Sequence, residues 1–203
     1  MDDQETFLVT PSKYLRTGIH VGMQIKSAHM ENFIFKVRLD KIDGGQSKIS
    51  IINLKKTDER IRIAAKMLSQ YNPEEILVVC RRETGWASLK QFEKFTGIKV
   101  VTRRYTPGMM TNIKLPDFIE SKIVLVSDVI LDRNSILDAN SIGIPVIGLC
   151  DTENNINFID LVIPCNNKGS KSLAMVFFLI AKNYLSNRGI ASDFVYEDFF
   201  QEV

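Results

Sequence analysis

The chain has 203 residues, 45% of them apolar, and a formal net charge of only +2 at pH 7. This length allows one large domain or two small ones, and the apolar fraction is ample for a packed core. The near balance of charges excludes a polycation, so any nucleic-acid binding must come from a local basic patch.

The cysteines and the apolar runs bear on where the protein resides. Cys80, Cys150 and Cys165 are an odd set without the spacing of a disulfide framework. We therefore expect a reducing, intracellular compartment. The acidic start has no apolar segment of the signal-peptide kind. The longest apolar run, Leu173–Ala181, is about half of the ~20 residues that a membrane-spanning helix needs, so no membrane partner is expected.

The first fifty residues give short, separate signals. Residues 1–10 form a loose acidic lead, and a short helix is predicted over Pro11–Arg16. Strands are predicted over Phe33–Val37 and Lys48–Asn53, with a turn at Asp43–Gly45 between them. We expect this region to form an N-terminal extension of loops and a short helix.

A longer helix is predicted next. Thr57 is expected to cap it, with two acidic residues in the first turn. Apolar residues then recur at i, i+3, i+4 and i+7 spacing and predict one buried stripe. They are Ile61, Ala64, Ala65, Leu68 and Tyr71.

From about residue 49 onward, predicted strands alternate with predicted helices. The helices end at Gly97, Gly143 and Gly189. The main strands are Ile76–Cys80, Ile98–Thr102, Ile123–Ser127, Val146–Leu149 and Leu161–Ile163. Short, unbroken apolar strands alternating with helices predict an α/β fold, a parallel sheet with helices on both faces. We expect one domain over residues 1–203, whose ends, 1–10 and 190–203, are loosely ordered or depend on a partner.

Two carboxylates leave an enzymatic function open. Asp128 and Asp151 each follow an apolar strand, where they could hold a Mg²⁺ ion; alternatively, each orders a loop. The stretch 123–136 is similar to the phosphoribosyltransferase motif. However, Ser127-Asp128 replaces its acid pair, and 132–135 replaces its Gly-containing phosphate loop. A phosphate-handling α/β enzyme is therefore the alternative function.

Two further features are weak candidates for binding. The helix start at 168–172 could bind an anion through its free N–H groups, or it could be an ordinary Ser-capped helix. His20 and His29 lie nine residues apart without the further ligands that a metal site needs. We expect no metal site and no catalytic residue.

Basic residues give the most specific binding hypothesis. Pairs of cations follow three predicted strands, and the ends of parallel strands share one rim of the sheet. That rim would suit phosphate contacts, with Trp86 or Tyr105 near enough to stack on a base; the alternative is scattered, solvated charge. The predicted RNA contacts are Arg81, Arg82, Arg103, Arg104, Lys168 and Lys171, with Lys26 and Arg38 in addition.

Several motifs together resemble one family. TPGMMTN, GIPVIGLCDT and VIPCNNKGSKS occur in this order within a similarity that spans residues 14 to 189. The chain closely resembles the small-subunit ribosomal protein two family in its archaeal form. The eukaryotic relative is ribosomal protein SA, also called the laminin-receptor precursor. Only Asp40–Ser47 separates the first strands, which leaves no room for the helical hairpin of the bacterial branch.

The resemblance implies a flavodoxin-like, doubly wound fold without catalysis, cofactor or small-molecule substrate. It implies a cytoplasmic, ribosome-bound structural protein between the head and the body of the small subunit. Its partners there would be small-subunit rRNA and other ribosomal proteins. It also assigns Asp128 and Asp151 to loop ordering.

Two positions depart from the family pattern. Arg103-Arg104-Tyr105 stands where the family usually has Gly-Arg-aromatic, and Asp128-Val129 stands where it usually has Asp-Pro. The first departure could alter a local RNA contact. A third class of function remains, a protein-binding module that uses the aromatic tail, Phe194 to Phe200.

Overall fold

The computed structural model describes residues 7–42 and 45–200 of the chain. Most of the predicted turn at Asp43–Gly45 lies outside this range. For residues 40–47 no side chain is described.

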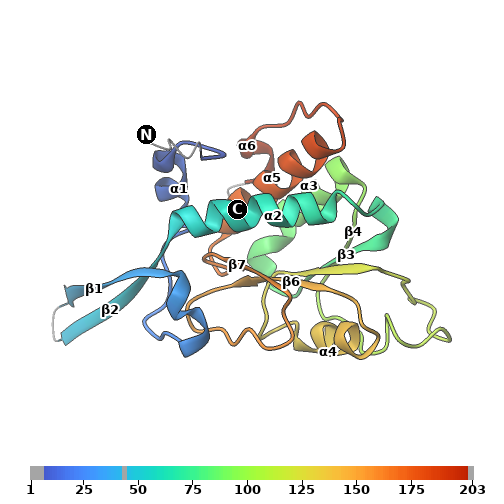
Figure 1. Ribbon diagram of the computed structural model, residues 1–203, viewed down its shortest axis with the longest axis horizontal. Coiled ribbons are helices and arrows are strands. Elements are labelled where there is room, and N and C mark those ends of the chain that lie inside the picture. The colour runs from blue at the N-terminus through green and yellow to red at the C-terminus, as the bar shows by residue number, and fades with distance from the viewer. Residues whose placement is uncertain (1–6, 43–44, 201–203) are drawn as a thin grey trace.

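An antiparallel hairpin extends from one end of the molecule (Figure 1). The short helix α1 precedes it and ends at Gly18, whose φ of 69° is a conformation that glycine adopts without strain. This N-terminal region comprises α1 (Pro11–Thr17), η1 (Ala28–Phe33), β1 (Ile34–Ile42) and β2 (Gly45–Ile52).

Five parallel strands form the central sheet, in the order β4-β3-β5-β6-β7. Counting β3 as the first strand of this sheet, the order is 2-1-3-4-5, which is that of flavodoxin-like folds. The predicted α/β, flavodoxin-like architecture is thus confirmed. The strands are β3 (Ile76–Cys80), β4 (Lys99–Thr102), β5 (Ile123–Val126), β6 (Val146–Cys150) and β7 (Leu161–Pro164).

Both faces of the sheet are buried, but they are covered differently (Figure 1). Alternate β3 residues belong to different core clusters: Val78 packs with the helices of one face, and Leu77 and Val79 pack with the other. The first face carries α2 (Leu54–Leu68), α3 (Trp86–Thr96) and α5 (Ser170–Asn187), with α6 (Tyr196–Phe199) on α3 and α5. The second face carries α4 (Arg133–Ser141) and irregular connections.

The predicted cap of α2 is wrong. The helix begins at Leu54, and the side chain of Asn53 accepts the N–H of Lys55 at 3.1 Å. Thr57 lies within the first turns, and its hydroxyl donates to the carbonyl of Pro164 at 2.8 Å. Asn53 is as good a cap as threonine, so Thr57 is free to tie the helix start to the end of β7.

The described parts of both chain ends pack against the core. Phe7–Val9 contact the first core cluster, and the N–H of Leu8 donates to Asp58 at 2.8 Å. Phe194 stacks on Phe95 with ring centroids 4.6 Å apart, and Phe199 is 1% exposed. Phe194 and Phe199 therefore pack in the core, whereas a tail that is free to dock a partner would expose them. Among the described helices, none combines the length and the apolar character needed to cross a bilayer.

Candidate nucleic-acid interface

The carboxyl edge of the sheet brings the predicted cations together. Cys80 and Thr102 are paired at the ends of β3 and β4, and the N–H of Arg103 donates to the carbonyl of Cys80 at 3.3 Å. Arg81 and Arg103 therefore leave neighbouring strands side by side. The edge continues through the ends of β5 and β6 to Cys165, which follows β7.

At the β3–β4 end, which we call the open end, three cations face solvent. The side chains of Arg81, Arg103 and Arg104 are exposed and have no hydrogen bond or ion pair with another described residue. Arg103 has φ = 88°, a left-handed conformation that is strained for any residue with a Cβ. The Gly that the family usually has at this position would adopt it without strain.

Arg82 and Asp128 form a partly buried pair behind this surface. The Arg82 side chain is 26% exposed and its guanidinium contacts the carboxylate of Asp128, which is 3% exposed. The other oxygen of Asp128 accepts the N–H groups of Ile130 at 2.9 Å and Leu131 at 3.3 Å. Asp128 therefore orders the loop after β5, as the resemblance implied.

A second acid at the open end is also withdrawn from solvent. Asp132 is 2% exposed and accepts the backbone N–H of Arg81 at 3.3 Å. Burial, together with the charge of nearby Asp128, raises the pKa of Asp132 to about 7. One acid is paired with Arg82, and the other is about half protonated at neutral pH while its charge interacts with Arg81, so the two acids offset the exposed arginines only in part.

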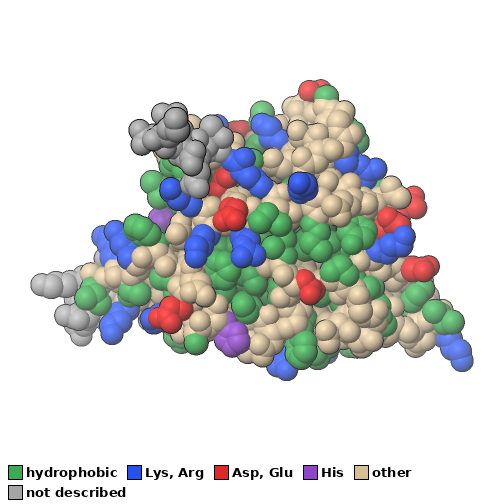
Figure 2. Space-filling model, viewed as in Figure 1, with side chains coloured by type: hydrophobic (Ala, Val, Ile, Leu, Met, Phe, Trp, Pro, Cys, Tyr) green, Lys and Arg blue, Asp and Glu red, His purple; other side chains and the backbone are tan. Residues whose placement is uncertain are grey.

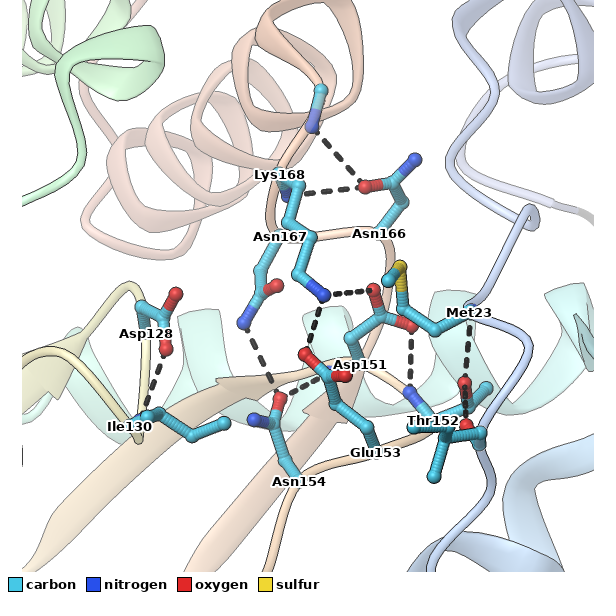
Figure 3. Close-up of polar contacts among 12 residues, drawn as sticks. Met23, Asp128, Ile130, Asp151, Thr152, Glu153, Asn154, Asn166, Asn167 and Lys168 are labelled. Carbon is cyan, nitrogen blue, oxygen red and sulfur yellow. Dashed lines mark hydrogen bonds and ion pairs between the residues drawn. The ribbon is translucent and has the colours of Figure 1, made fainter.

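At the β6–β7 end, which we call the covered end, Lys168 is held by acids (Figure 3). Its Nζ lies 3.8 Å from Asp151 Oδ2 and also contacts Glu153, and the lysine side chain is 28% exposed. Asp151 is 1% exposed and accepts the N–H of Thr152 at 2.6 Å. Burial raises the pKa of Asp151, and the charge of Lys168 opposes that shift.

The segment 19–27 lies over this end. The N–H of Met23 donates to the Thr152 hydroxyl at 2.9 Å, and the N–H of Ser27 donates to the Thr152 carbonyl at 2.8 Å. A Cβ at Gly22 would lie 2.5 Å from the Thr152 methyl and 2.9 Å from the Ser50 carbonyl oxygen. Only glycine permits this approach without a shift, so Gly22 lets the segment close over the edge.

The start of α5 has no side-chain cap, because its N-cap residue is Gly169, and the predicted Ser cap is therefore wrong. Asn166 Oδ1 accepts the N–H groups of Lys168 at 3.0 Å and Gly169 at 3.1 Å. These two amides precede the first turn of α5, so the bonds order the turn that leads into the helix.

The remaining predicted contacts are dispersed. Lys26 pairs with Glu31 at 3.0 Å, and Lys171 lies 5.2 Å from the centre of the Phe200 ring. Arg38 is exposed on β1, away from the sheet edge. The structure thus groups Arg81, Arg103 and Arg104, not the full predicted set.

Neither predicted stacking residue presents a free ring. Tyr105 is 3% exposed, and its hydroxyl donates to Asp138 at 2.9 Å. Trp86 is half-buried against the first core cluster. Both rings serve packing, so neither is placed for base stacking.

The sequence interpretation missed a second basic surface on α1 and α2. Figure 2 shows Lys and Arg side chains over α2 and along the hairpin. The sequence did contain a signal for this surface, because α2 carries five cations. One of its acids, Asp58, accepts a hydrogen bond from Tyr14 and pairs with Arg62. The exposed cations of the two helices are Lys13, Arg16, Lys55, Arg62 and Lys66.

The described residues hold no group of three or more His, Cys, Asp or Glu side chains arranged to bind a metal ion. All three cysteines are buried and free of disulfides. Burial raises the pKa of the Cys80 thiol to about 11, so it is not a reactive thiolate at neutral pH.

Comparisons with known proteins agree with this fold. The family described as Ribosomal protein S2 matches residues 14–115 and 114–186. The small ribosomal subunit protein uS2 of Methanococcus maripaludis (strain C5) is 42% identical over 98% of this chain and 88% of its own length. Its counterparts in Picrophilus torridus and Nanoarchaeum equitans are 39% and 42% identical, over 98% and 90% of this chain and 96% and 88% of their own lengths. The chain therefore belongs to the ribosomal protein S2 family.

Proposed function

We propose that this small-subunit ribosomal protein binds small-subunit rRNA through the open end of its sheet edge. It acts as a structural constituent that supports translation and carries out no reaction. Neighbouring ribosomal proteins contact it between the head and the body of the subunit. The protein is then cytoplasmic and ribosome-bound, as the family resemblance implies.

The observation that carries the rRNA contact is the conformation of Arg103. Its backbone is left-handed and its side chain extends into solvent without a partner among the described residues. Strain of this kind persists where surrounding structure holds it, and it collects at functional sites. Arg104 follows it in the chain and Arg81 leaves the neighbouring strand, so three exposed cations lie at the same end of the sheet edge. Phosphate contacts are the main source of affinity for nucleic acids.

The acids of the edge argue against the enzymatic alternative. A phosphate-handling site would need Asp128 and Asp151 free to hold a metal ion. Asp128 is engaged by Arg82 and by two backbone N–H groups. Asp151 is engaged by Lys168 and by Thr152. Both acids are thus used in ordering loops.

The test measures how affinity for purified small-subunit rRNA depends on salt. Arg81→Gln, Arg103→Gln and Arg104→Gln should each weaken binding and reduce the slope of log K against log salt by roughly 1. Lys99→Gln is the matched control, because Lys99 is an exposed cation at the opposite end of β4. Slopes that stay at the wild-type value in all three variants would reject the open end as an rRNA contact.

Assembly into the subunit is tested separately by sedimentation. The wild-type chain should migrate with small subunits at low salt and be released as the salt concentration rises. A chain that remains in the soluble fractions at low salt would contradict ribosome binding.

A further inference from the structure

A groove of about 210 Å³ lies on the second face of the sheet, between the start of α4 and the connection from β6 to β7. Its apolar lining comes from the loop after β5, from α4 and from that connection. Three of the lining side chains are unusually exposed for their type: Ile130 is 57%, Leu137 is 40% and Phe158 is 54% exposed. Large apolar groups gathered around one groove indicate an interaction surface.

The groove lies beside a connection that contains no helix. Crossovers in a doubly wound sheet usually carry a helix, but residues 151–160 join β6 to β7 without one, as residues 103–122 join β4 to β5. The flank of α4 that carries Leu137 therefore lacks a neighbouring helix among the described residues. Leu137 thus stays exposed, although Ile136 and Ala139 of the same helix are buried.

Both walls of the groove are fixed before any partner arrives. Asp128 holds the backbone of Ile130 on one side. On the other side, Asp160 ties the connection to β6 through two hydrogen bonds. Its N–H donates to the Val146 carbonyl at 2.9 Å, and its carboxylate accepts the Val146 N–H at 2.8 Å. A Cβ atom at Gly148 would lie 3.1 Å from the Ile159 side chain. Because glycine has no Cβ, the connection can pack closely on the sheet at this position. A preformed groove reduces the ordering cost of binding.

Phe158 is held out from the surface by a strained backbone. Its φ of 67° is left-handed, and the turn that contains it is closed by the N–H of Ile159 donating to Ile156 at 3.2 Å. An aromatic residue kept exposed in an unfavourable conformation gives the free protein no evident benefit. It is suited to anchor a partner, because aromatic residues dominate binding hot spots.

The charges of the groove select the class of partner. Among the lining residues, all in the described part of the chain, Arg133 alone is charged, and its guanidinium has no partner among the described residues. Binding an RNA backbone requires several cations. An apolar surface with an aromatic residue and an arginine, but without lysine or acid, has instead the composition of a protein interface core.

We infer that this groove docks a segment of a neighbouring small-subunit ribosomal protein, which inserts an apolar side chain beside Phe158 and places a carboxylate against Arg133. The inference rests on the proposed function, because it requires assembly into the small subunit. It adds a protein-docking site on the second face of the sheet, separate from the cations of the open end.

Site-specific cross-linking identifies the occupant. The native cysteines are buried, so a thiol-directed photo-cross-linker on Asn157→Cys labels the groove alone. Within assembled small subunits we expect an adduct to a ribosomal protein, with Lys90→Cys on α3 as the exposed control on the other face. An adduct to rRNA, or a yield no higher than that of the control, would overturn the inference.

Affinity measurements separate this site from the rRNA contact. Arg133→Glu and Leu137→Glu should lower affinity for subunits depleted of this protein about tenfold, as expected of interface anchors. Their affinity for naked rRNA should stay at the wild-type level. Ile142→Glu is the matched control, because Ile142 is 44% exposed and lies outside the groove. Unchanged affinity for depleted subunits, or an equal loss on naked rRNA, would contradict the docking site.

The two proposals fail in different ways. If the open-end variants keep their salt slopes while the groove variants lose affinity for depleted subunits, the rRNA contact is wrong and the docking site stands. The reverse result would remove the docking site and leave the rRNA contact.

Discussion

The two ends of one sheet edge use the same kinds of residue for different purposes. At the open end, Arg81, Arg103 and Arg104 face solvent, and the nearby acids are paired or partly protonated. At the covered end, Lys168 is drawn into contact with Asp151 and Glu153, and the segment 19–27 lies over the strand ends. Both ends follow apolar parallel strands, so strand position alone does not distinguish them.

What distinguishes the two ends is the partner available to each cation. A charge that is largely removed from water must be compensated, so Lys168 contributes to folding. A charge that stays in water needs no partner, and it is available for a ligand. The comparison predicts that removing paired charges changes stability, while removing exposed charges changes rRNA binding.

The largest effect is expected from Asp128→Ala. This change leaves Arg82 without its carboxylate and removes the acceptor for the N–H groups of Ile130 and Leu131. Breaking such a buried pair should lower the free energy of unfolding by about 3 kcal/mol, measured by denaturant titration. Asp128→Asn keeps one acceptor and should lose less. Glu83→Gln, an exposed acid after the same strand as Arg82, should change stability by less than about 0.5 kcal/mol.

Lys168→Met tests the covered end directly. Asp151 is 1% exposed and would lose a cation 3.8 Å away, so we expect a loss of about 2 kcal/mol in unfolding free energy. The salt slope of rRNA binding should not change. A slope reduced by roughly 1 without a loss of stability would break the comparison and return Lys168 to the phosphate contacts. Lys171→Met, at an exposed lysine in the first turn of α5, is the control for stability.

Sequence patterns predicted the sheet because the strands are apolar on both faces. The strand Ile76–Cys80 was predicted to the residue, and the other strands of the central sheet were predicted within one residue at each end. The hairpin strands extend beyond the predicted Phe33–Val37 and Lys48–Asn53, by up to five residues. The cap of α2 was missed because Asn53 and Thr57 are both good capping residues, and only the tertiary contact with Pro164 decides between them. Local propensity cannot report a contact between residues far apart in the chain.

The sequence predicted where the candidate site lies, but not which of its cations remain unpaired. The parallel sheet correctly placed Arg81, Arg103 and Lys168 along one edge. Which of them remains unpaired depends on Asp128, Asp151 and the covering segment, and those contacts join distant parts of the sequence. The groove beside Phe158 gave no sequence signal, because a left-handed backbone at a phenylalanine contradicts its local preference.

The buried acid of the open end should make stability depend on pH. The pKa of Asp132 is raised from 3.8 to about 7 in the folded protein, so between these values the folded state binds more protons than the unfolded state. Stability should therefore fall as pH rises from about 4 to 7, and this contribution should level off above 7. Asp132→Asn should remove that slope, with a relative gain of roughly 3 kcal/mol from pH 5 to 8.

Denaturant titrations at several pH values measure this effect. Asp117→Asn is a suitable comparison, because Asp117 is an exposed acid on the connection from β4 to β5. An equal pH slope in the wild type and in Asp132→Asn would show that Asp132 is ionised in the folded protein. The open end would then carry an acid that opposes its arginines.

The smallest change in stability is expected from Arg103→Gly, and it gives the sharpest test of the comparison. Glycine adopts the φ of 88° without strain. Relief of that strain, offset in part by the greater freedom of glycine in the unfolded chain, should leave stability unchanged or raise it by up to about 1 kcal/mol. In the same variant, the slope of log K against log salt for rRNA binding should fall by roughly 1.

Opposite changes in stability and binding identify a cation that is retained for its ligand. Arg103→Ala is the matched variant, because it removes the same guanidinium but keeps a Cβ in the left-handed conformation. It should bind rRNA as weakly as Arg103→Gly while being less stable. If Arg103→Gly lost stability as well as binding, Arg103 would support the fold as Lys168 does, and the two ends of the edge would no longer differ.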